Sequence, residues 1–174
     1  MKLASFYETI RWTTQWIIIT TKEAPTIATI HLYLASTNHQ STNITATTPA
    51  AWVVILRYAD HQKVLNDGGY GHTETSLALS ALTTALATLK RHDLPVHVHT
   101  TTEQVAAVIS EQRYLSWRQN NWDVPEADQP DLPQWQTLIP IIEEFPNLTI
   151  TYHPVDDPAM TTATTTLTAV MTKL

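Results

Sequence analysis

Three histidines at alternating positions are the residues of this sequence best suited to metal chemistry. His97 and His99 lie two residues apart in Val96–Thr101, and His31 lies in Ile30–Ala35. Both segments alternate apolar and polar residues, as a strand with one buried face does, so His97 and His99 share a face. If the two strands pair, three imidazoles meet under the first long helix, where they suit a transition metal. No nearby carboxylate is expected to orient the rings, so hydrogen-bonded structural histidines are the alternative.

Acidic side chains are the second group that could hold a metal, but they are widely spaced. Glu74 precedes an apolar helical pattern, Glu103 follows a strand-like segment, and Asp156 and Asp157 stand before Pro158. A relocated site built from Glu74, Glu103 and one of the two aspartates would serve metal-assisted hydrolysis. The alternative is structural, with each glutamate at the start of a helix and the aspartates in a turn into the last helix.

The composition narrows the function classes. The chain has 174 residues, enough for one domain with a single core, and no cysteine, which excludes disulfides and thiolate metal sites. Its formal net charge of −6 predicts weak or absent binding to phosphate backbones. The apolar run Trp16–Ile19 is much shorter than the roughly 20 residues that span a bilayer. We therefore expect a soluble, cytoplasmic protein with no membrane partner.

The spacing of apolar residues predicts a mixed α/β domain. The third strand should end before the turn-like run Asn66–Gly69, and the first helix should carry Lys90 and Arg91 in its last turn. Pro140 should kink or shorten the helix that contains it. In chain order, strands are expected at Ile30–Ala35, Ala51–Tyr58, Gln62–Leu65, Val96–Thr101 and Leu148–His153, and helices at Leu77–Lys90, Thr102–Ser110, Asp131–Glu144 and Ala159–Leu174.

Several short segments together resemble one known family, ribonuclease H, in their order and spacing. The resemblance covers residues 26–174 and leaves residues 1–25 as an N-terminal extension. It implies the ribonuclease H-like α/β fold, a mixed five-stranded sheet of three antiparallel strands and then two parallel ones, flanked by helices. The matching residues are Ile55–Tyr58 in the second strand, Thr73 five residues before the family's helix glutamate, Trp117 and Trp122, and Asp131-Leu132 followed by Trp135, Gln136 and Leu138.

The resemblance also implies two-metal hydrolysis, in which clustered carboxylates hold two magnesium ions. This sequence departs from the family at all of those positions. Alanine methyls and threonine hydroxyls cannot hold a divalent pair, so we predict no metal cofactor and no ribonuclease H activity. The carboxylate positions fall on Ala35, Ala78, Thr101 and, depending on a one-residue gap near Pro154, Ala163 or Thr164.

The features with which the family binds its substrate are reduced as well. The region around the spaced tryptophans is lysine-rich in many ribonucleases H, but residues 117–128 hold one arginine and three acids. Arg113, Trp117 and Arg118 could still contact a strand by charge and stacking, whereas Trp117 and Trp122 could instead be core residues. His153 matches the family's loop histidine, whose role lapses without a metal.

Three functions remain open at this point. The first is a catalytically inactive ribonuclease H-like domain, retained as a structural module or as a module that binds an unidentified protein. The second is an inactive nucleic-acid-binding domain that recognises an RNA/DNA hybrid or structured RNA by shape. The third is a hydrolase with a relocated metal site. A homodimer contact through residues 1–25 is a further expectation.

Overall fold

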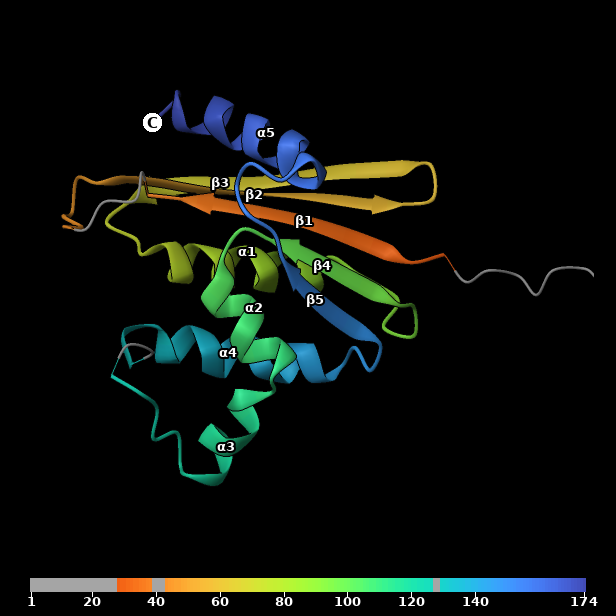
Figure 1. Ribbon diagram of the computed structural model, residues 1–174, viewed down its shortest axis with the longest axis vertical. Helices are drawn as coiled ribbons and strands as arrows, with labels where there is room; N and C mark the ends of the chain where they lie inside the picture. The colour runs from red at the N-terminus through yellow and green to blue at the C-terminus, as the bar shows by residue number, and fades with distance from the viewer. Residues whose placement is uncertain (1–27, 39–42, 127–128) are drawn as a thin grey trace, which may run out of the picture.

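The computed structural model describes residues 28–38, 43–126 and 129–174, which form one mixed sheet with helices on both faces (Figure 1). The N-terminal extension and its expected dimer contact lie outside the described residues. No helix in the described part of the chain is both long and apolar enough to cross a membrane. The elements are β1 (Ile30–Thr37), β2 (Pro49–Tyr58), β3 (His61–Tyr70), α1 (Glu74–Ala87), β4 (Val96–Thr100), α2 (Glu103–Ser110), α3 (Arg113–Gln119), η1 (Gln129–Asp131), α4 (Leu132–Glu143), β5 (Leu148–Tyr152), η2 (Pro158–Met160) and α5 (Thr161–Met171).

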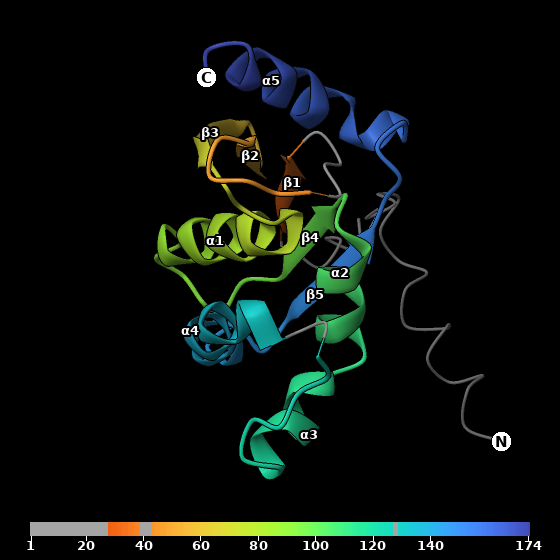
Figure 2. The same cartoon turned by 90° about the vertical axis from the view of Figure 1, so that its left-hand side faces the viewer.

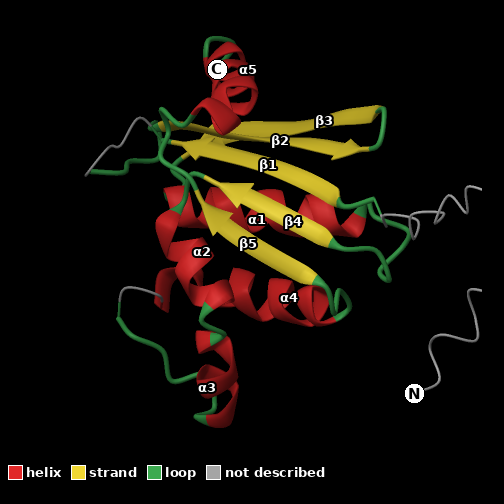
Figure 3. Cartoon of the chain, turned by 45° about the vertical axis from the view of Figure 1, so that its right-hand side comes forward, coloured by secondary structure: helices red, strands yellow, loops and turns green. Residues whose placement is uncertain are grey.

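The sheet has the strand order β3-β2-β1-β4-β5 (Figure 3). β1 pairs antiparallel with β2 and parallel with β4, and His31 stands opposite His97 in the parallel pair. β5 continues the parallel half, with Thr151 opposite His99. The expected sheet of three antiparallel and two parallel strands is therefore confirmed.

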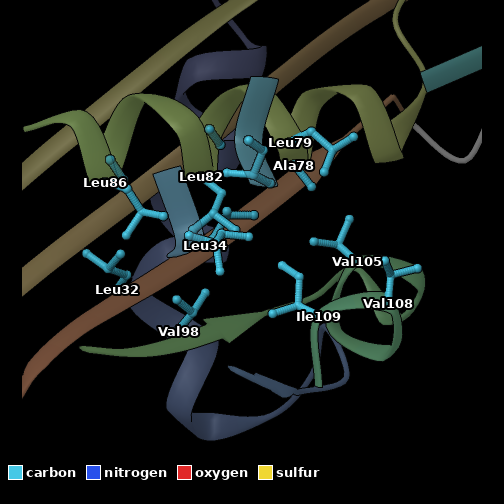
Figure 4. Close-up of a cluster of buried hydrophobic side chains, with 14 of the residues drawn as sticks. Leu32, Leu34, Ala78, Leu79, Leu82, Leu86, Val98, Val105, Val108 and Ile109 are labelled. Carbon is cyan, nitrogen blue, oxygen red and sulfur yellow. The ribbon is translucent and has the colours of Figure 1, made fainter. Parts of the chain in front are cut away.

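Two apolar cores lie on opposite faces of this sheet, because successive side chains of a strand point to opposite sides. Figure 4 shows part of the larger core, where Leu34 of β1 and Val98 of β4 face Leu82 of α1. The smaller core joins the other face to α5, which contributes Ala163 and Leu167. Figure 2 shows α1 and α5 on opposite sides of β1 and β2.

The structure differs from the sequence-based expectation at β3 and α1, and it contains the short helix α3, which was not predicted. Asn66–Gly69 is not a turn but part of β3, which pairs with β2 along all ten of its residues. α1 begins three residues early and ends at Ala87, where Thr88 caps it, so Lys90 and Arg91 lie beyond the helix. Pro140 does not shorten α4, which continues to Glu143.

The threonine-rich α5 depends on packing, as its composition predicts. Threonine is a poor helix former, and several hydroxyls here bond to the carbonyl four residues earlier, including Thr166 to Thr162 at 2.7 Å and Thr168 to Thr164 at 3.0 Å. The apolar side of the helix is nevertheless buried against the sheet, with Leu167 only 6% exposed. Burying a leucine of this kind contributes about 1.5–3 kcal/mol, which offsets a deficit of up to about 0.7 kcal/mol for each of several threonines.

Candidate functional site

A hollow of about 330 Å³ opens where β1 and β4 end, beside the first turn of α1 and one side of α5. Ala35 and Thr101 come to the same edge because β1 and β4 are parallel neighbours, and the amide of Thr101 donates to the carbonyl of Leu34 at 3.2 Å. Thr164 and Thr168 close the hollow from α5. Three of the expected family positions, Ala35, Thr101 and Thr164, therefore line one cavity.

The fourth expected position, Ala78, does not reach this hollow. It lies fully buried in the larger core, between α1 and the sheet (Figure 4). One turn earlier, Glu74 is the one acid among the described residues that line the hollow. Thr73 starts the helix there by accepting a hydrogen bond from the amide of Ser76 at 2.9 Å. Burial raises the pKa of the Glu74 carboxyl above its ordinary value.

The remaining polar groups of the hollow are neutral hydroxyls. The hydroxyl oxygen of Thr101 is buried and has no hydrogen-bond partner among the described residues. Ser36 shares a 3.1 Å hydrogen bond with Thr102, and the hydroxyl of Thr164 donates to the carbonyl of Met160 at 3.2 Å. Ala163, the alternative position on α5, is 1% exposed and packs in the smaller core with Ala35. The hollow is therefore apolar and hydroxyl-lined rather than acidic.

The other acids proposed for a relocated site do not join Glu74. Glu103 is exposed at the start of α2, and Asp156 is exposed in the loop before η2. Asp157 accepts a hydrogen bond from the amide of Ala159 at 2.8 Å and so caps η2. These placements match the structural roles expected for the start of each helix. The described residues contain no group of three acids close enough to share an ion.

The three histidines do come together, but not where we expected them. His31 on β1 and His97 and His99 on β4 form a group in which one ring nitrogen from each lies within 4.8 Å of the others. They point to the face of the sheet opposite α1, because their strand neighbours Leu32 and Val98 are the residues that pack in the larger core with α1. The expectation that they meet under α1 is therefore wrong. Alternation shows which side chains share a face but not which helix covers it.

A carboxylate orients the histidines, contrary to the expectation that none lies near them. Nδ1 of His153 lies 2.9 Å from Oδ2 of Asp157, and Nε2 of His153 lies 3.0 Å from Nδ1 of His99. Nε2 of His99 lies in turn 3.1 Å from Nδ1 of His31. The i,i+4 spacing of His153 and Asp157 before a proline was the available signal, but the loop's position beside β4 could not be predicted from it.

The histidines nearest the middle of this cluster resist protonation. Burial lowers the pKa of His99 from its ordinary value of 6.5 to about 4, and the neighbouring imidazoles add to the shift. Burial lowers the pKa of His97 as well. The hydrogen bond from His153 holds the pKa of Asp157 below its ordinary value. At neutral pH, His99 is therefore uncharged. Its hydrogen-bond partner is His153, which is linked to the carboxylate of Asp157.

The side chains expected to contact nucleic acid are engaged within the protein. Trp117 is 5% exposed and meets Trp135 edge to face, with ring centroids 5.6 Å apart. Arg118 forms an ion pair with Glu143, and Nε of Arg113 lies 2.7 Å from Glu111. Trp117 thus occupies the core position that was the alternative to base stacking.

Known proteins resemble this chain in part of their sequence and in their fold. No family model matches the chain. The ribonuclease H of Saccharopolyspora erythraea is 33% identical over 82 residues, which are 47% of this chain and 52% of that protein. The ribonuclease H of Oleidesulfovibrio alaskensis is 27% identical over 107 residues, 60% of this chain and 66% of the relative. The chain thus spans between about half and two thirds of these relatives' lengths.

Solved structures agree on the architecture over more of the chain. LC9-RNase H1, a type 1 RNase H with the type 2 active-site motif, matches with a TM-score of 0.65 and 13% identity, covering 86% of this chain and 75% of that one. LC11-RNase H1 in complex with an RNA/DNA hybrid matches with a TM-score of 0.57 and 18% identity, covering 83% and 97%. The fold is that of ribonuclease H.

The residues at the edge of this ribonuclease H fold do not fit the magnesium pair that the resemblance implies. Magnesium needs near-octahedral oxygen ligands, carboxylates above all, because it gives up water reluctantly. Ala35 and Ala78 supply no oxygen, and Thr101 supplies one neutral hydroxyl. Glu74 alone cannot hold two ions. We therefore derive no hydrolytic step through a metal in this hollow.

Proposed function

We propose that this chain is a ribonuclease H-fold domain without ribonuclease H activity, which serves as a structural or protein-interaction module. The observation that carries the proposal is the replacement of the carboxylates expected at the sheet edge by Ala35, Ala78 and Thr101, with Ala163 or Thr164 on α5. Clustered carboxylates repel one another when no metal is bound, so their removal favours the metal-free fold.

The packing around these positions supports the same proposal. Ala78 is fully buried in the larger core, and Ala35 and Ala163 share the smaller one. A methyl group at these three positions packs without desolvating a charge. The residues therefore suit a domain held together by its two cores, with no requirement for bound ions.

Hydrolysis of a labelled RNA/DNA hybrid by the full chain tests the proposal. We expect no cleavage above the buffer background in either magnesium or manganese. Metal-dependent cleavage that is lost in Glu74→Gln would overturn it, because Glu74 is the acid that lines the hollow. Ser80→Glu serves as a folded control, since Ser80 is exposed on α1 away from the hollow.

Binding of a hybrid without cleavage is the second candidate, because the chain shares its fold with LC11-RNase H1, solved in complex with an RNA/DNA hybrid. The net charge of −6 and the surface ion pair between Arg118 and Glu143 weigh against it. Fluorescence anisotropy with a labelled hybrid separates the two. If the chain binds the hybrid through its phosphates, its affinity should fall steeply between about 50 and 200 mM salt. A protein-interaction module should show no binding of the hybrid at either concentration.

A further inference from the structure

We propose that His31, His97 and His99 form a binding site for a transition-metal ion, zinc being the best suited, on the sheet face beside α5. This inference is independent of the proposed function, because the site lies on different residues from the hollow. It rests on three observations: the grouping of the rings, their hydrogen-bonded orientation and their partial exposure.

The grouping follows from strand pairing. β1 and β4 are parallel neighbours with His31 opposite His97, and His99 is the next residue of β4 on the same face. The ring centroids of His97 and His99 lie 4.2 Å apart, and those of His31 and His99 lie 5.4 Å apart. Two alternating histidines on one strand and a third on the neighbouring strand thus present three imidazoles from a rigid part of the sheet.

The nitrogen positions suit a four-coordinate ion. Two nitrogens bound to one zinc ion at about 2.0–2.1 Å in tetrahedral geometry lie about 3.4 Å apart. Nδ1 of His31 and Nε2 of His99 are already 3.1 Å apart. One ring nitrogen of His97 lies within 4.8 Å of one ring nitrogen of each of the other two histidines, so a rotation of this half-buried ring completes the set. Three protein ligands leave a fourth position open for water or a small anion.

The hydrogen bonds of the outer partners prepare His99 as a ligand. The carboxylate of Asp157 can only accept, so a neutral His153 donates from Nδ1 and accepts at Nε2. His99 therefore donates from Nδ1 to His153 and keeps a lone pair on Nε2, directed toward His31. An ion between the two takes that lone pair, and His31 then carries its proton on Nε2 in place of Nδ1. Ligand histidines of protein metal sites characteristically donate their second ring N–H to an acceptor, and here that acceptor is His153, which Asp157 orients in turn.

The surroundings allow an ion to enter. His31, His97 and His99 are all half-buried, so the rings are fixed by neighbours without being sealed from solvent. Tyr33 stacks on His99 with its centroid 4.5 Å away and an angle of 7° between the rings. Nε2 of His97 lies 2.9 Å from the hydroxyl of Thr151, which leaves its Nδ1 for the ion. Soft-to-borderline divalent ions prefer such nitrogen sets to the oxygen sets that magnesium requires.

Isothermal titration calorimetry of the full chain with zinc tests the proposal. Titration with cobalt adds an optical measurement, because the absorption spectrum of the bound ion reports four-coordination. We expect one ion per chain for the native protein and for His61→Asn, a control histidine exposed at the start of β3. His97→Asn and His99→Asn should each bind at least about tenfold more weakly. Absence of stoichiometric binding by the native chain, or unchanged binding by both ligand variants, would overturn the proposal.

Asp157→Asn provides a second test that does not remove a ligand. The asparagine carbonyl can still accept from Ala159, but the amide nitrogen cannot accept from His153. As a positioning residue, Asp157 should therefore affect the site itself: we expect about 10–100-fold weaker zinc binding and an altered cobalt spectrum. A purely structural role for Asp157 would lower stability and leave zinc affinity and the cobalt spectrum unchanged, and that result would contradict the orienting role.

Discussion

Ala35 of β1 and Ala163 of α5 belong to one buried apolar cluster, with exposed fractions of 0% and 1%. Family resemblance assigns a carboxylate to Ala35 and to Ala163 or its neighbour Thr164, so α5 packs on the sheet where the ribonuclease H reaction would need charge. Two carboxylates in this contact would have to be desolvated or neutralised by a metal. Alanine methyl groups at Ala35 and Ala163 fill this contact without that desolvation.

The burial of Ala78 predicts that its family counterpart, glutamate, cannot be restored without cost. Ala78→Glu should lower the free energy of unfolding by about 3 kcal/mol, since it adds volume and a charge to the packed core. Ser80→Glu puts the same side chain on an exposed position of α1 and should change stability by less than about 0.5 kcal/mol. Urea denaturation of both variants measures the difference. Equal midpoints would show that α1 does not pack as described.

Trp117 provides a test of whether the tryptophan region is core or binding surface. Trp117→Ala should reduce the free energy of unfolding by about 3–5 kcal/mol, because it empties the space against Trp135. Leu115→Ala on the same helix is the control, since Leu115 is 42% exposed and should matter little. A stable Trp117→Ala protein with reduced affinity for a hybrid would instead favour the nucleic-acid candidate.

The sequence predicts the strands of this fold well where burial on one face produces alternation. β3 was the exception, because Asn66–Gly69 has the composition of a turn but continues to pair with β2, placing Gly69 opposite Ala50. Sheet pairing overrides such local preferences. The seven-residue α3 was missed because so short a helix carries little periodic signal and is stabilised by packing.

The sequence predicted the residues of the candidate sites better than their surroundings. The alternation of side chains along β1 and β4 correctly grouped His31, His97 and His99. The expected position under α1 was wrong, because the three rings lie on the opposite face of the sheet. The link from Asp157 through His153 to His99 joins a loop to a strand 54 residues earlier, which no local pattern reveals. Glu74, the first residue of α1, lines the hollow, whereas Ala78 at the family's glutamate position does not.

The lowered pKa of His99 predicts acid sensitivity in the metal-free protein. Between about pH 6.5 and pH 4 the unfolded chain binds a proton that folded His99 does not, so stability falls as the pH decreases through this range and is unaffected above it. The neighbouring imidazoles of His31, His97 and His153 disfavour protonation of His99, whereas the carboxylate of Asp157 favours it.

Urea midpoints at about pH 7 and about pH 5, measured with a chelator present, check this expectation. His99→Asn should show a smaller loss of stability between the two pH values than the native protein. The exposed His61 allows a matched control, His61→Asn, which should keep the native pH dependence. An identical loss in the native and His99→Asn proteins would assign the acid sensitivity to other groups.

Returning two carboxylates to the hollow should make the fold depend on metal. Ala35→Asp with Thr101→Asp puts two acids at the ends of neighbouring strands, where Glu74 also lines the hollow. Without metal, the double variant should be less stable than the native protein, since like charges are brought together in a partly buried site. Manganese should recover part of that loss, because an ion that binds only the folded state stabilises it by mass action.

Ala50→Asp is the control, because Ala50 is buried in the larger core away from the hollow. This variant should be destabilised equally with and without manganese. If manganese fails to raise the melting temperature of the double variant while its circular dichroism remains native, then the hollow does not correspond to the metal site of ribonuclease H.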